Sequence, residues 1–484
     1  CPERWTGLAL DLHAVAGLCL ALPLALTGGG SAVQLFLLWA LYNSLVNVGQ
    51  TPYGFGWESQ LLETGFLAIF FCPLRHAGAV PTSMPPPSVG VWAARWLLFR
   101  IMIGAGLIKL RGDRCWRDLS AMDFFYETQP VPNPLSRRLH FAPRAWHRFE
   151  TFAGLWIVEI VTPFLLLLPG GGTMGLLRSF AAVLQIFFQF VLISSGNLSF
   201  LNWLTIAPTF LCLSDANLAS ITAPATRAAA AQAAEQTANA NALLSASNCM
   251  TPQALATLAL GAVRPHHVAS ALLLFIVVRG SVPVVANLLE LGGRRQVMNT
   301  AFGAWRTVNT YGAFGSVTRT RYEVILQGTS DALPTADAHW REYEFRVKPG
   351  AVSRRPPFLS PFHYRLDWLM WFLPFSSWRA NGWLLRLVAK LLTADVPTRQ
   401  LLRMDPFDGI TFADVKSSDR ADAAEMPLSR ESAPKWIRGM LYEYRFAPLG
   451  EQDHWNRTLV REYLPPVSLA TLAPLLQQAG LPPP

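Results

Sequence analysis

Charge is scarce in this sequence of 484 residues. Charged residues make up 15% of it and apolar residues 51%, whereas soluble domains carry roughly 25% charge. The deficit lies in one part of the chain: residues 1–299 hold 18 Lys/Arg and 13 Asp/Glu, and residues 300–484 hold 22 and 18. The first part therefore has a membrane-like composition and the second a water-facing one. This pattern excludes a disordered chain, a coiled coil and a single soluble enzyme domain.

Cysteine pairs and catalytic motifs are also absent. The six cysteines include no C-x-x-C pair, and none lies beyond Cys249. A zinc site of several thiolates is therefore not expected, and the second part must fold without disulfides. No H-E-x-x-H, G-x-S-x-G or Walker lysine loop occurs, and the one G-x-G-x-x-G string, Gly170–Gly175, follows no strand. The sequence thus predicts neither a bound metal nor a cofactor.

The net charge of +9 does not predict a nucleic-acid partner. Its densest part, eight Lys/Arg between Lys109 and Arg148, flanks apolar segments, where basic residues report membrane topology. A bilayer core of ~30 Å needs ~20 helical residues. Eight segments are candidates, and two of them, 61–74 and 198–213, are short enough to be re-entrant or tilted. The other six are 8–26, 31–49, 89–110, 152–168, 176–194 and 268–291.

We predict a polytopic α-helical membrane bundle over residues 1–299, followed by a second domain over residues 300–484. Residues 111–151 form a long connection rich in charge, aromatic residues and proline. Residues 214–252 contain 14 alanines and almost no bulky apolar residue. Such a tract cannot bury a core, so we interpret it as a dispensable low-complexity insertion.

Several ionisable residues lie inside the apolar segments, where a charge facing lipid is costly. We expect each of them to point into the bundle and pair, and Glu63 and Glu159 in particular to lie beside a basic or polar partner such as Arg95, Arg100 or Lys109. Two interpretations of the two carboxylates stay open: ion pairs that fix helix register, or a proton relay or substrate site. The ionisable residues are Asp11, His13, Glu63, Arg95, Arg100, Glu159 and Arg279.

The apolar period changes to two beyond residue 300. Apolar and charged residues alternate over 342–348 and 442–446, and more weakly over 322–327 and 458–463. Alternation of this kind is typical of strands covered on one face. The second domain is therefore predicted to be β-rich, as a small antiparallel sheet or a sandwich.

A tryptophan-rich stretch, His363–Leu392, lies between these strands. After a helix cap at Ser376 or Ser377, Arg379, Arg386 and Lys390 fall on one helical face, opposite an apolar face of Trp383, Leu384, Leu387, Leu391 and Leu392. Two interpretations stay open for this amphipathic helix: it lies in the membrane interface, or it packs on the sheet.

Longer blocks of sequence resemble a known family. Gly106–Pro134 (GLIKLRGDRCWRDLSAMDFFYETQPVPNP) closely resembles the signature loop of the lipase maturation factor family, membrane proteins of the endoplasmic reticulum. Further blocks agree in order, beginning at Asn47, His147, Ser195, Val308, Ser360 and Pro434. The resemblance spans residues 40 to 446, and the alanine-rich insertion is where this chain departs from it.

The resemblance implies a non-enzymatic role as a chaperone and assembly factor. Family members help homodimeric secreted lipases fold, and their C-terminal domain faces the lumen. Counting eight spans, the positive-inside rule instead places the C-terminal domain in the cytosol; we follow the family, because long charged segments translocate regardless of charge. The sequons at Asn456 and Asn197 are candidate N-glycosylation sites that report this topology.

A rival function is a membrane-embedded enzyme or lipid-handling protein, since the helical half is distantly similar to the vitamin K-dependent carboxylase fold. A solvent-connected polar cavity lined by Glu63, Lys109 and Glu159 favours the enzyme, and a dry, paired interior favours the scaffold. The candidate functional residues of the signature loop and the spans are Glu63, Lys109, Asp113, Arg114, Trp116, Asp118 and Glu159.

Overall fold

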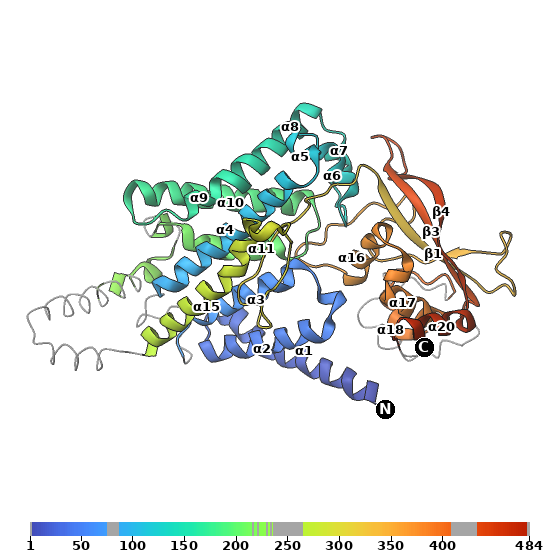
Figure 1. Cartoon of the computed structure of the whole chain (residues 1–484), viewed down its shortest axis with the longest axis horizontal. Helices are drawn as coiled ribbons and strands as arrows, with labels where there is room; N and C mark the ends of the chain where they lie inside the picture. Colours follow the sequence, from blue (N-terminus) through green and yellow to red (C-terminus); the bar gives the residue numbers. More distant parts are fainter. Residues whose placement is uncertain are drawn as a thin grey trace, which may run out of the picture. The chain divides into compact units, whose positions relative to one another are not determined.

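The chain forms two compact units, each built from three separate segments. We describe a computed structural model, which covers residues 2–74, 87–214, 217–219, 222–228, 231–232, 235, 265–407 and 433–481 (Figure 1). The bundle unit comprises Cys1–Asp118, Glu150–Val191 and Leu201–Ser316, and the sheet unit comprises Leu119–Phe149, Leu192–Phe200 and Val317–Pro484. Most of the predicted insertion at 214–252 lies outside the described residues.

The bundle unit is helical. Its longer elements are α1 (Pro2–Thr27), α2 (Ala32–Gly49), α3 (Gly56–Ile69), α4 (Ser88–Arg111), π-helix η2 (Ala153–Val161), α9 (Thr162–Leu166), α10 (Gly172–Ser195), α11 (Leu201–Thr209) and α15 (Pro265–Leu288). The short helices are η1 (Thr51–Tyr53), α5 (Arg114–Arg117), η3 (Phe210–Cys212) and η5 (Leu291–Gly293). A further short helix, α8 (Arg144–Phe152), runs from the sheet unit into η2.

Six helices in the described part of the chain are long and apolar enough to cross a membrane. They are Gly7–Thr27, Ala32–Gly49, Ser88–Arg111, Arg144–Leu166, Gly172–Ser195 and His267–Leu288. The two short candidates do not reach this length: α3 has 14 residues, and the apolar helix at the other position runs over Leu201–Cys212. A polytopic helical membrane bundle is therefore confirmed.

Helix α4 lies at the centre of the bundle and α1 and α15 at its periphery. In the most apolar window of each helix, 61% of α4 is buried, against 11% of α15 and none of α1. Asp11 on α1 and Arg279 on α15 are accordingly exposed. The prediction that every ionisable residue of the spans points into the bundle was wrong for these two, because their helices contact few neighbours.

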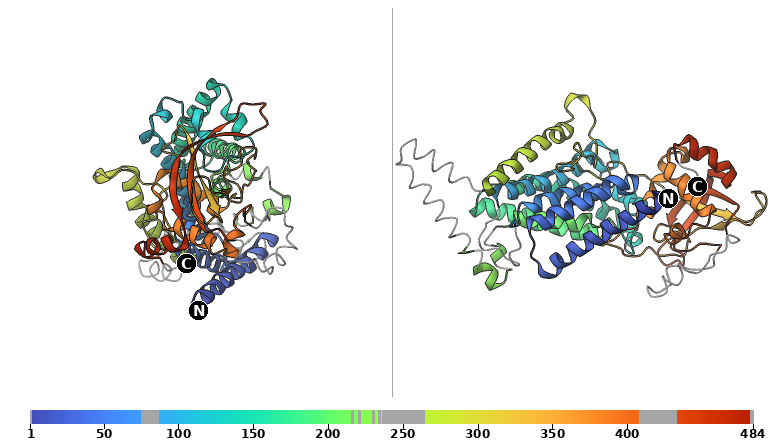
Figure 2. Two further views of the ribbon diagram at one scale, coloured as in Figure 1. Left: turned by 90° about the vertical axis from the view of Figure 1, so that its right-hand side faces the viewer. Right: turned by 90° about the horizontal axis from the view of Figure 1, so that it is seen from below.

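The sheet unit contains an antiparallel sheet of four strands in the order β2-β1-β3-β4. The strands are β1 (Arg321–Thr329), β2 (Arg341–Glu342), β3 (Trp436–Phe446) and β4 (Trp455–Val467). Strands β3 and β4 form a long, bent hairpin (Figure 2). Val324 of β1 stands opposite Leu441 of β3, and three register shifts interrupt the pairing of β3 with β4. The predicted antiparallel β-rich domain is confirmed.

The strands are covered more completely than alternation predicted. Val324, Leu326 and Leu441 pack on one face of the sheet against helices, and Ile325 and Tyr444 form a second cluster with Trp455. One-sided coverage was therefore wrong for β1, where all nine residues except Tyr322 are buried. The predicted strand at 342–348 shrinks to two residues, although Tyr343, Phe345 and Val347 are buried as their alternation requires.

Short helices complete the sheet unit: α6 (Met122–Thr128), α7 (Ser136–His140), α16 (Arg365–Phe372), η6 (Leu373–Phe375), η7 (Trp378–Ala380), α17 (Gly382–Leu392), α18 (Val396–Arg399) and α20 (Leu469–Gln478). The amphipathic helix is α17, and its Leu384, Leu387 and Leu391 are buried in the cluster that contains Val324 and Leu441. Of the two interpretations of this helix, the structure shows packing on the sheet. Its apolar face is covered within its own unit.

Candidate functional site

A buried polar cluster surrounds Glu63 in the bundle unit. The carboxylate pairs with Arg100 of α4, and both side chains are 1% exposed. Its Oε2 accepts hydrogen bonds from the Asn309 backbone N–H at 2.9 Å and from the Tyr311 hydroxyl at 2.7 Å. Arg100 also donates to the Asn309 carbonyl oxygen at 2.7 Å. The charge of Glu63 is therefore matched by a cation and by neutral donors of Asn309 and Tyr311.

Glycines in α4 and just beyond it let an irregular segment enter this cluster. A Cβ added to Gly104 would clash with the Tyr311 carbonyl oxygen, and one added to Gly112 would clash with the Gly315 carbonyl oxygen. The segment around Tyr311 therefore lies directly on the α4 backbone. Several of its backbone groups have partners there, as buried backbone outside regular structure requires. The Asn309 N–H donates to Glu63, and the Gly315 carbonyl oxygen accepts the Asp113 N–H.

The second buried ion pair joins Lys109 of α4 to Glu159 of π-helix η2. The ammonium also lies 4.8 Å from the centre of the Trp116 ring, a cation–π contact. Glu159 Oε2 is buried and, among the described residues, accepts no hydrogen bond. This pair combines a π-helix, which is a rare element often found at functional sites, with an incompletely satisfied carboxylate.

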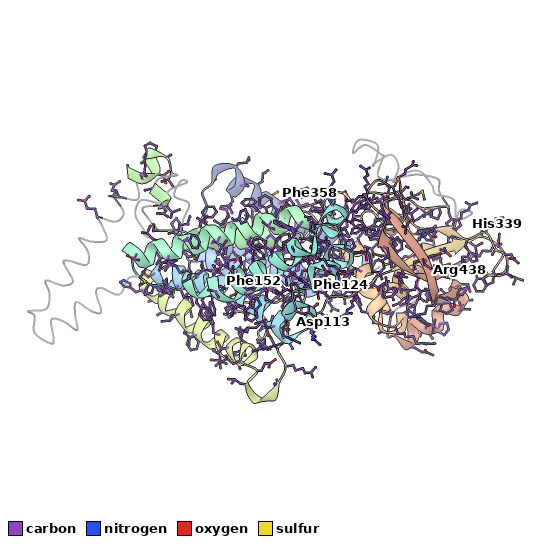
Figure 3. All side chains as sticks on the ribbon, turned by 90° about the horizontal axis from the view of Figure 1, so that it is seen from above. Asp113, Phe124, Phe152, His339, Phe358 and Arg438 are labelled. Carbon is purple, nitrogen blue, oxygen red and sulfur yellow. The ribbon has the colours of Figure 1, made fainter. Side chains whose placement is uncertain are left out.

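The signature loop holds the segment that follows Tyr311. The Asp113 N–H donates to the Gly315 carbonyl oxygen at 2.9 Å, and the buried Trp116 indole donates to the Phe314 carbonyl oxygen at 2.8 Å. Asp113, labelled in Figure 3, is half-buried. Arg114 and Asp118 are exposed and 3.9 Å apart. Arg114 and Asp118 are therefore on the surface, whereas the buried Trp116 binds the segment that follows Tyr311.

The predicted partners of the two carboxylates are largely confirmed. Glu63 pairs with Arg100 and Glu159 with Lys109, whereas Arg95 donates to the Leu211 carbonyl oxygen. Lys109, Trp116 and Glu159 come together, and Glu63 belongs to a separate cluster. Sequence reasoning missed Asn309 and Tyr311, although both lie in the block that begins at Val308. No signal in the sequence alone connects that block to Glu63.

An apolar cavity of the bundle unit contains none of these charges. It measures about 860 Å³ and is lined by α4, α15 and Leu167. Glu63, Lys109 and Glu159 are not among its lining residues. Among the residues that the structure describes, no group of three or more His, Cys, Asp or Glu could hold a metal ion. The ion pairs Glu63–Arg100 and Lys109–Glu159 do not line this apolar cavity.

The sheet unit has its own buried charges, on the face opposite α17. Arg321 donates to Glu323 Oε1 from its Nε at 2.9 Å and from its Nη2 at 2.5 Å, and Lys348 Nζ lies 3.0 Å from Glu323 Oε2. Arg321 also donates to the carbonyl oxygens of Glu127 and Pro130 at 3.0 Å. The Glu127 carboxylate in turn accepts the Phe446 backbone N–H at 2.8 Å. These bonds attach the second half of the signature loop to the sheet.

Two histidines of the sheet unit are held neutral by burial. Burial, helped by the cations Arg137 and Arg355, lowers the pKa of His454 to about 4. Burial beside Arg365 likewise lowers the pKa of His363 to about 4. The His454 ring stacks edge-on against Phe446 and Trp455, with centroids 5.5 Å apart in each case. Both rings therefore act as core aromatic groups near neutral pH.

Strand β4 forms one edge of the sheet and, among the described strands, pairs with β3 alone. Leu459 and Val460 are 52% and 46% exposed there. His339 and Arg438, labelled in Figure 3, come from the β1–β2 connection and from β3. Asn456 of the first sequon is exposed on β4, whereas Asn197 is buried and its amide donates to the Pro132 and Pro357 carbonyl oxygens. Only Asn456 offers its side chain at the surface of the folded unit.

These features define a class: a polytopic membrane protein with two buried ion pairs in its helical bundle and a β-rich domain carrying an open sheet edge. Two protein-family models identify the family within this class. Residues 3–220 match the lipase maturation factor transmembrane domain, and residues 307–465 match the lipase maturation factor C-terminal domain. No solved structure matches the chain.

Curated relatives agree over almost the whole chain. It is 44% identical to lipase maturation factor 1 of Homo sapiens, over 98% of this chain and 77% of that protein. The chain is 45% identical to lipase maturation factor 1 of Mus musculus, over 96% of this chain and 75% of that protein. The chain is 31% identical to lipase maturation factor 2 of Mus musculus, over 98% of this chain and 76% of that protein. The chain belongs to the lipase maturation factor family.

Proposed function

We propose that this protein is a chaperone and assembly factor of the endoplasmic reticulum membrane, which promotes the folding, dimer assembly and maturation of homodimeric secreted lipases. The observation that carries this proposal is the 44% identity, over nearly the whole chain, to a protein named for lipase maturation. In this proposal the bundle anchors the protein in the bilayer, and the sheet unit faces the lumen.

The buried charges support a scaffold. Glu63 has a cation and neutral donors around it, and Lys109 lies between Glu159 and the Trp116 ring. Breaking such pairs is costly, by about 3–5 kcal/mol for each partner removed. We propose that Glu63, Lys109, Trp116 and Glu159 fix the register of α3, α4 and η2, and that Asp113, Arg114 and Asp118 are surface residues of the signature loop.

The β4 edge is the surface that best suits an incompletely assembled client. An exposed edge strand offers unpaired backbone donors and acceptors, to which an extended segment can add as a further strand. Leu459 and Val460 add apolar area beside this edge. A lipase subunit that has not yet met its partner exposes apolar surface of the kind that such an edge can hold.

Secretion of an active lipase tests the proposal. The chain is expressed with a homodimeric secreted lipase in cells that lack their own maturation factor, and lipase activity in the medium is compared with total lipase. We expect wild type to raise activity per lipase molecule, and Leu459→Asp/Val460→Asp to lose at least half of that gain. Leu449→Asp, at a position 57% exposed in the β3–β4 connection, is the matched control. Unchanged activity with wild type contradicts the proposal.

Crosslinked pull-down of the tagged chain gives the direct readout. Newly synthesised lipase should be recovered with wild type and with the Leu449→Asp control, and reduced with the β4 variant. If all three recover no lipase while the chain is present and membrane-inserted, the chaperone proposal fails.

A second candidate function, a membrane-embedded enzyme or lipid-handling protein, has one observation in its favour. Glu159 Oε2 is buried beside Lys109 and, within the described residues, accepts no hydrogen bond. A carboxylate in that state suits proton transfer. Glu159→Gln keeps the shape of the side chain, so loss of lipase maturation with normal thermal stability and normal lipase pull-down would favour the enzyme.

A further inference from the structure

The cavity beside α4 is an apolar groove on the membrane-facing side of the bundle unit. It lies between the first half of α4 and α15, which run side by side (Figure 1). Its volume is about 860 Å³, within the ~300–1,000 Å³ typical of ligand pockets. Its lining includes Trp92, Trp96, Leu274, Val278, Val282 and Ala286.

Polar groups inside the groove bond to one another. The Trp96 indole donates to the Ser281 hydroxyl oxygen at 2.8 Å, and that hydroxyl donates to the Val277 carbonyl oxygen at 2.6 Å. Val278 and Val282 are 57% and 65% exposed. The groove therefore offers an open hydrocarbon surface, with its polar atoms turned to internal partners, and suits an apolar occupant.

The length of the groove fits one leaflet of a bilayer. Leu274 and Ala286 are 12 positions apart on α15, or about 18 Å along a helix axis. Half of the hydrocarbon core is about 15 Å thick. Because α15 is a membrane-spanning candidate with 11% of its apolar window buried, the medium around this face is lipid. An acyl chain can therefore lie along the groove over its whole length.

A basic cluster lies just past the end of the groove. Helices α4 and α15 run parallel, since Leu97 clusters with Leu273 and Ile103 with Leu288. Both helices thus end on the same side of the membrane. The groove continues to Leu291, and the exposed Arg294 and Arg295 follow three and four residues later.

The acid at this end of the groove is already engaged. Glu290 accepts the Gln296 backbone N–H at 3.1 Å and lies 3.7 Å from Arg111. Arg111 also donates to the Leu288 carbonyl oxygen at 2.9 Å. The three arginines Arg111, Arg294 and Arg295 outnumber Glu290 at the end of the groove and leave a net charge of +2 there. An anion placed there meets a net positive field.

We infer that this groove binds an anionic glycerophospholipid of the bilayer, with one acyl chain between α4 and α15 and its phosphate at Arg294 and Arg295. Burying the chain gains little by the hydrophobic effect, because the bilayer is equally apolar. Selectivity therefore comes from the head group. At ~1 kcal/mol for each basic residue near the surface, two arginines favour an anionic over a zwitterionic lipid by roughly 30-fold.

Native mass spectrometry of the full chain tests the inference. The chain is purified from nanodiscs of phosphatidylcholine with a minor fraction of phosphatidylserine, released into mild detergent, and weighed. We expect one retained phospholipid, enriched in phosphatidylserine by at least tenfold over its share of the nanodisc. Arg294→Gln/Arg295→Gln should retain lipid but lose the enrichment, and Val282→Trp, which fills the groove, should lose the retained lipid.

Two matched controls separate the groove from general charge and bulk. Arg144→Gln/Arg148→Gln removes two exposed arginines from the end of another span, and Leu272→Trp adds the same ring on α15 outside the groove lining. Both should behave as wild type. Inorganic phosphate at millimolar concentration should not displace the lipid, and displacement would assign the site to a free anion. Equal retention of both lipids, or lipid retention by Val282→Trp equal to wild type, overturns the inference.

Discussion

The Tyr311 hydroxyl lies 2.7 Å from Glu63 Oε2, although 248 positions separate the two residues. Glu63 is on α3, near the start of the bundle, and Tyr311 is in the irregular segment after α15. Their hydrogen bond connects a helix near the start of the bundle unit to the segment that follows its last long helix. It also explains why a carboxylate is tolerated there, since both α4 and the segment after α15 supply its partners.

The first prediction concerns this cluster. Glu63→Ala leaves the Arg100 guanidinium buried without its counter-ion, so we expect the free energy of unfolding to fall by about 3–5 kcal/mol. Glu63→Leu/Arg100→Leu removes both charges and should recover part of that loss. Thermal unfolding of the detergent-solubilised chain measures both variants. A double variant less stable than the single one would show that the pair contributes net stability.

The second prediction concerns the close approach at α4. Gly104→Ala places a Cβ against the Tyr311 carbonyl oxygen, so we expect a loss of about 1–3 kcal/mol, typical of overpacking. Gly17→Ala in α1 is the matched control, because nothing lies within 4 Å of its Cβ position. The control should keep or slightly raise the melting temperature. Equal melting temperatures for the two variants would contradict this account of Gly104.

The third prediction is an acid sensitivity of the sheet unit. The folded pKa of His454 is about 4 and its ordinary value is 6.5, so between these values the unfolded state binds a proton that the folded state does not. The free energy of unfolding is therefore highest above pH 6.5 and falls as the pH drops towards 4. His363 acts in the same direction.

His454→Phe tests the third prediction, because it keeps the ring contacts with Phe446 and Trp455 and removes the titrating nitrogens. Melting temperatures are measured at pH 7.5, 6 and 5. Wild type should lose more stability than the variant over this range, and the variant should keep the smaller slope that His363 supplies. Parallel pH profiles would rule out His454 as a source of the sensitivity.

The fourth prediction concerns topology. If the sheet unit faces the lumen, Asn456 on the exposed β4 edge should carry an N-glycan. Translation in microsomes should give a mobility shift that glycosidase removes and that Asn456→Gln abolishes. Asn197→Gln should leave the shift in place, because the Asn197 side chain is buried in the folded unit. An unglycosylated sheet unit digested by protease outside intact microsomes would place it in the cytosol.

The sequence by itself determined the class of the fold. The lengths and low charge of the apolar segments predicted the membrane helices, because a span must satisfy its backbone within one helix and is therefore a local property. Alternation over 442–446 and 322–327 predicted β3 and β1 for the same reason, since the side-chain period of a strand is local. The partners Arg100 and Lys109 could be proposed for Glu63 and Glu159 because a buried charge needs a counter-ion.

Only the tertiary structure decided what long-range packing controls. Asn309 and Tyr311 donate hydrogen bonds to Glu63. The residues around Glu159 form a π-helix. Glu127 is bonded to the sheet through Arg321 and Phe446. The apolar face of α17 packs on the sheet. The periods of helices and strands show which residues share a face, and they do not show what covers it. That depends on contacts between residues far apart in the chain, here up to 319 positions.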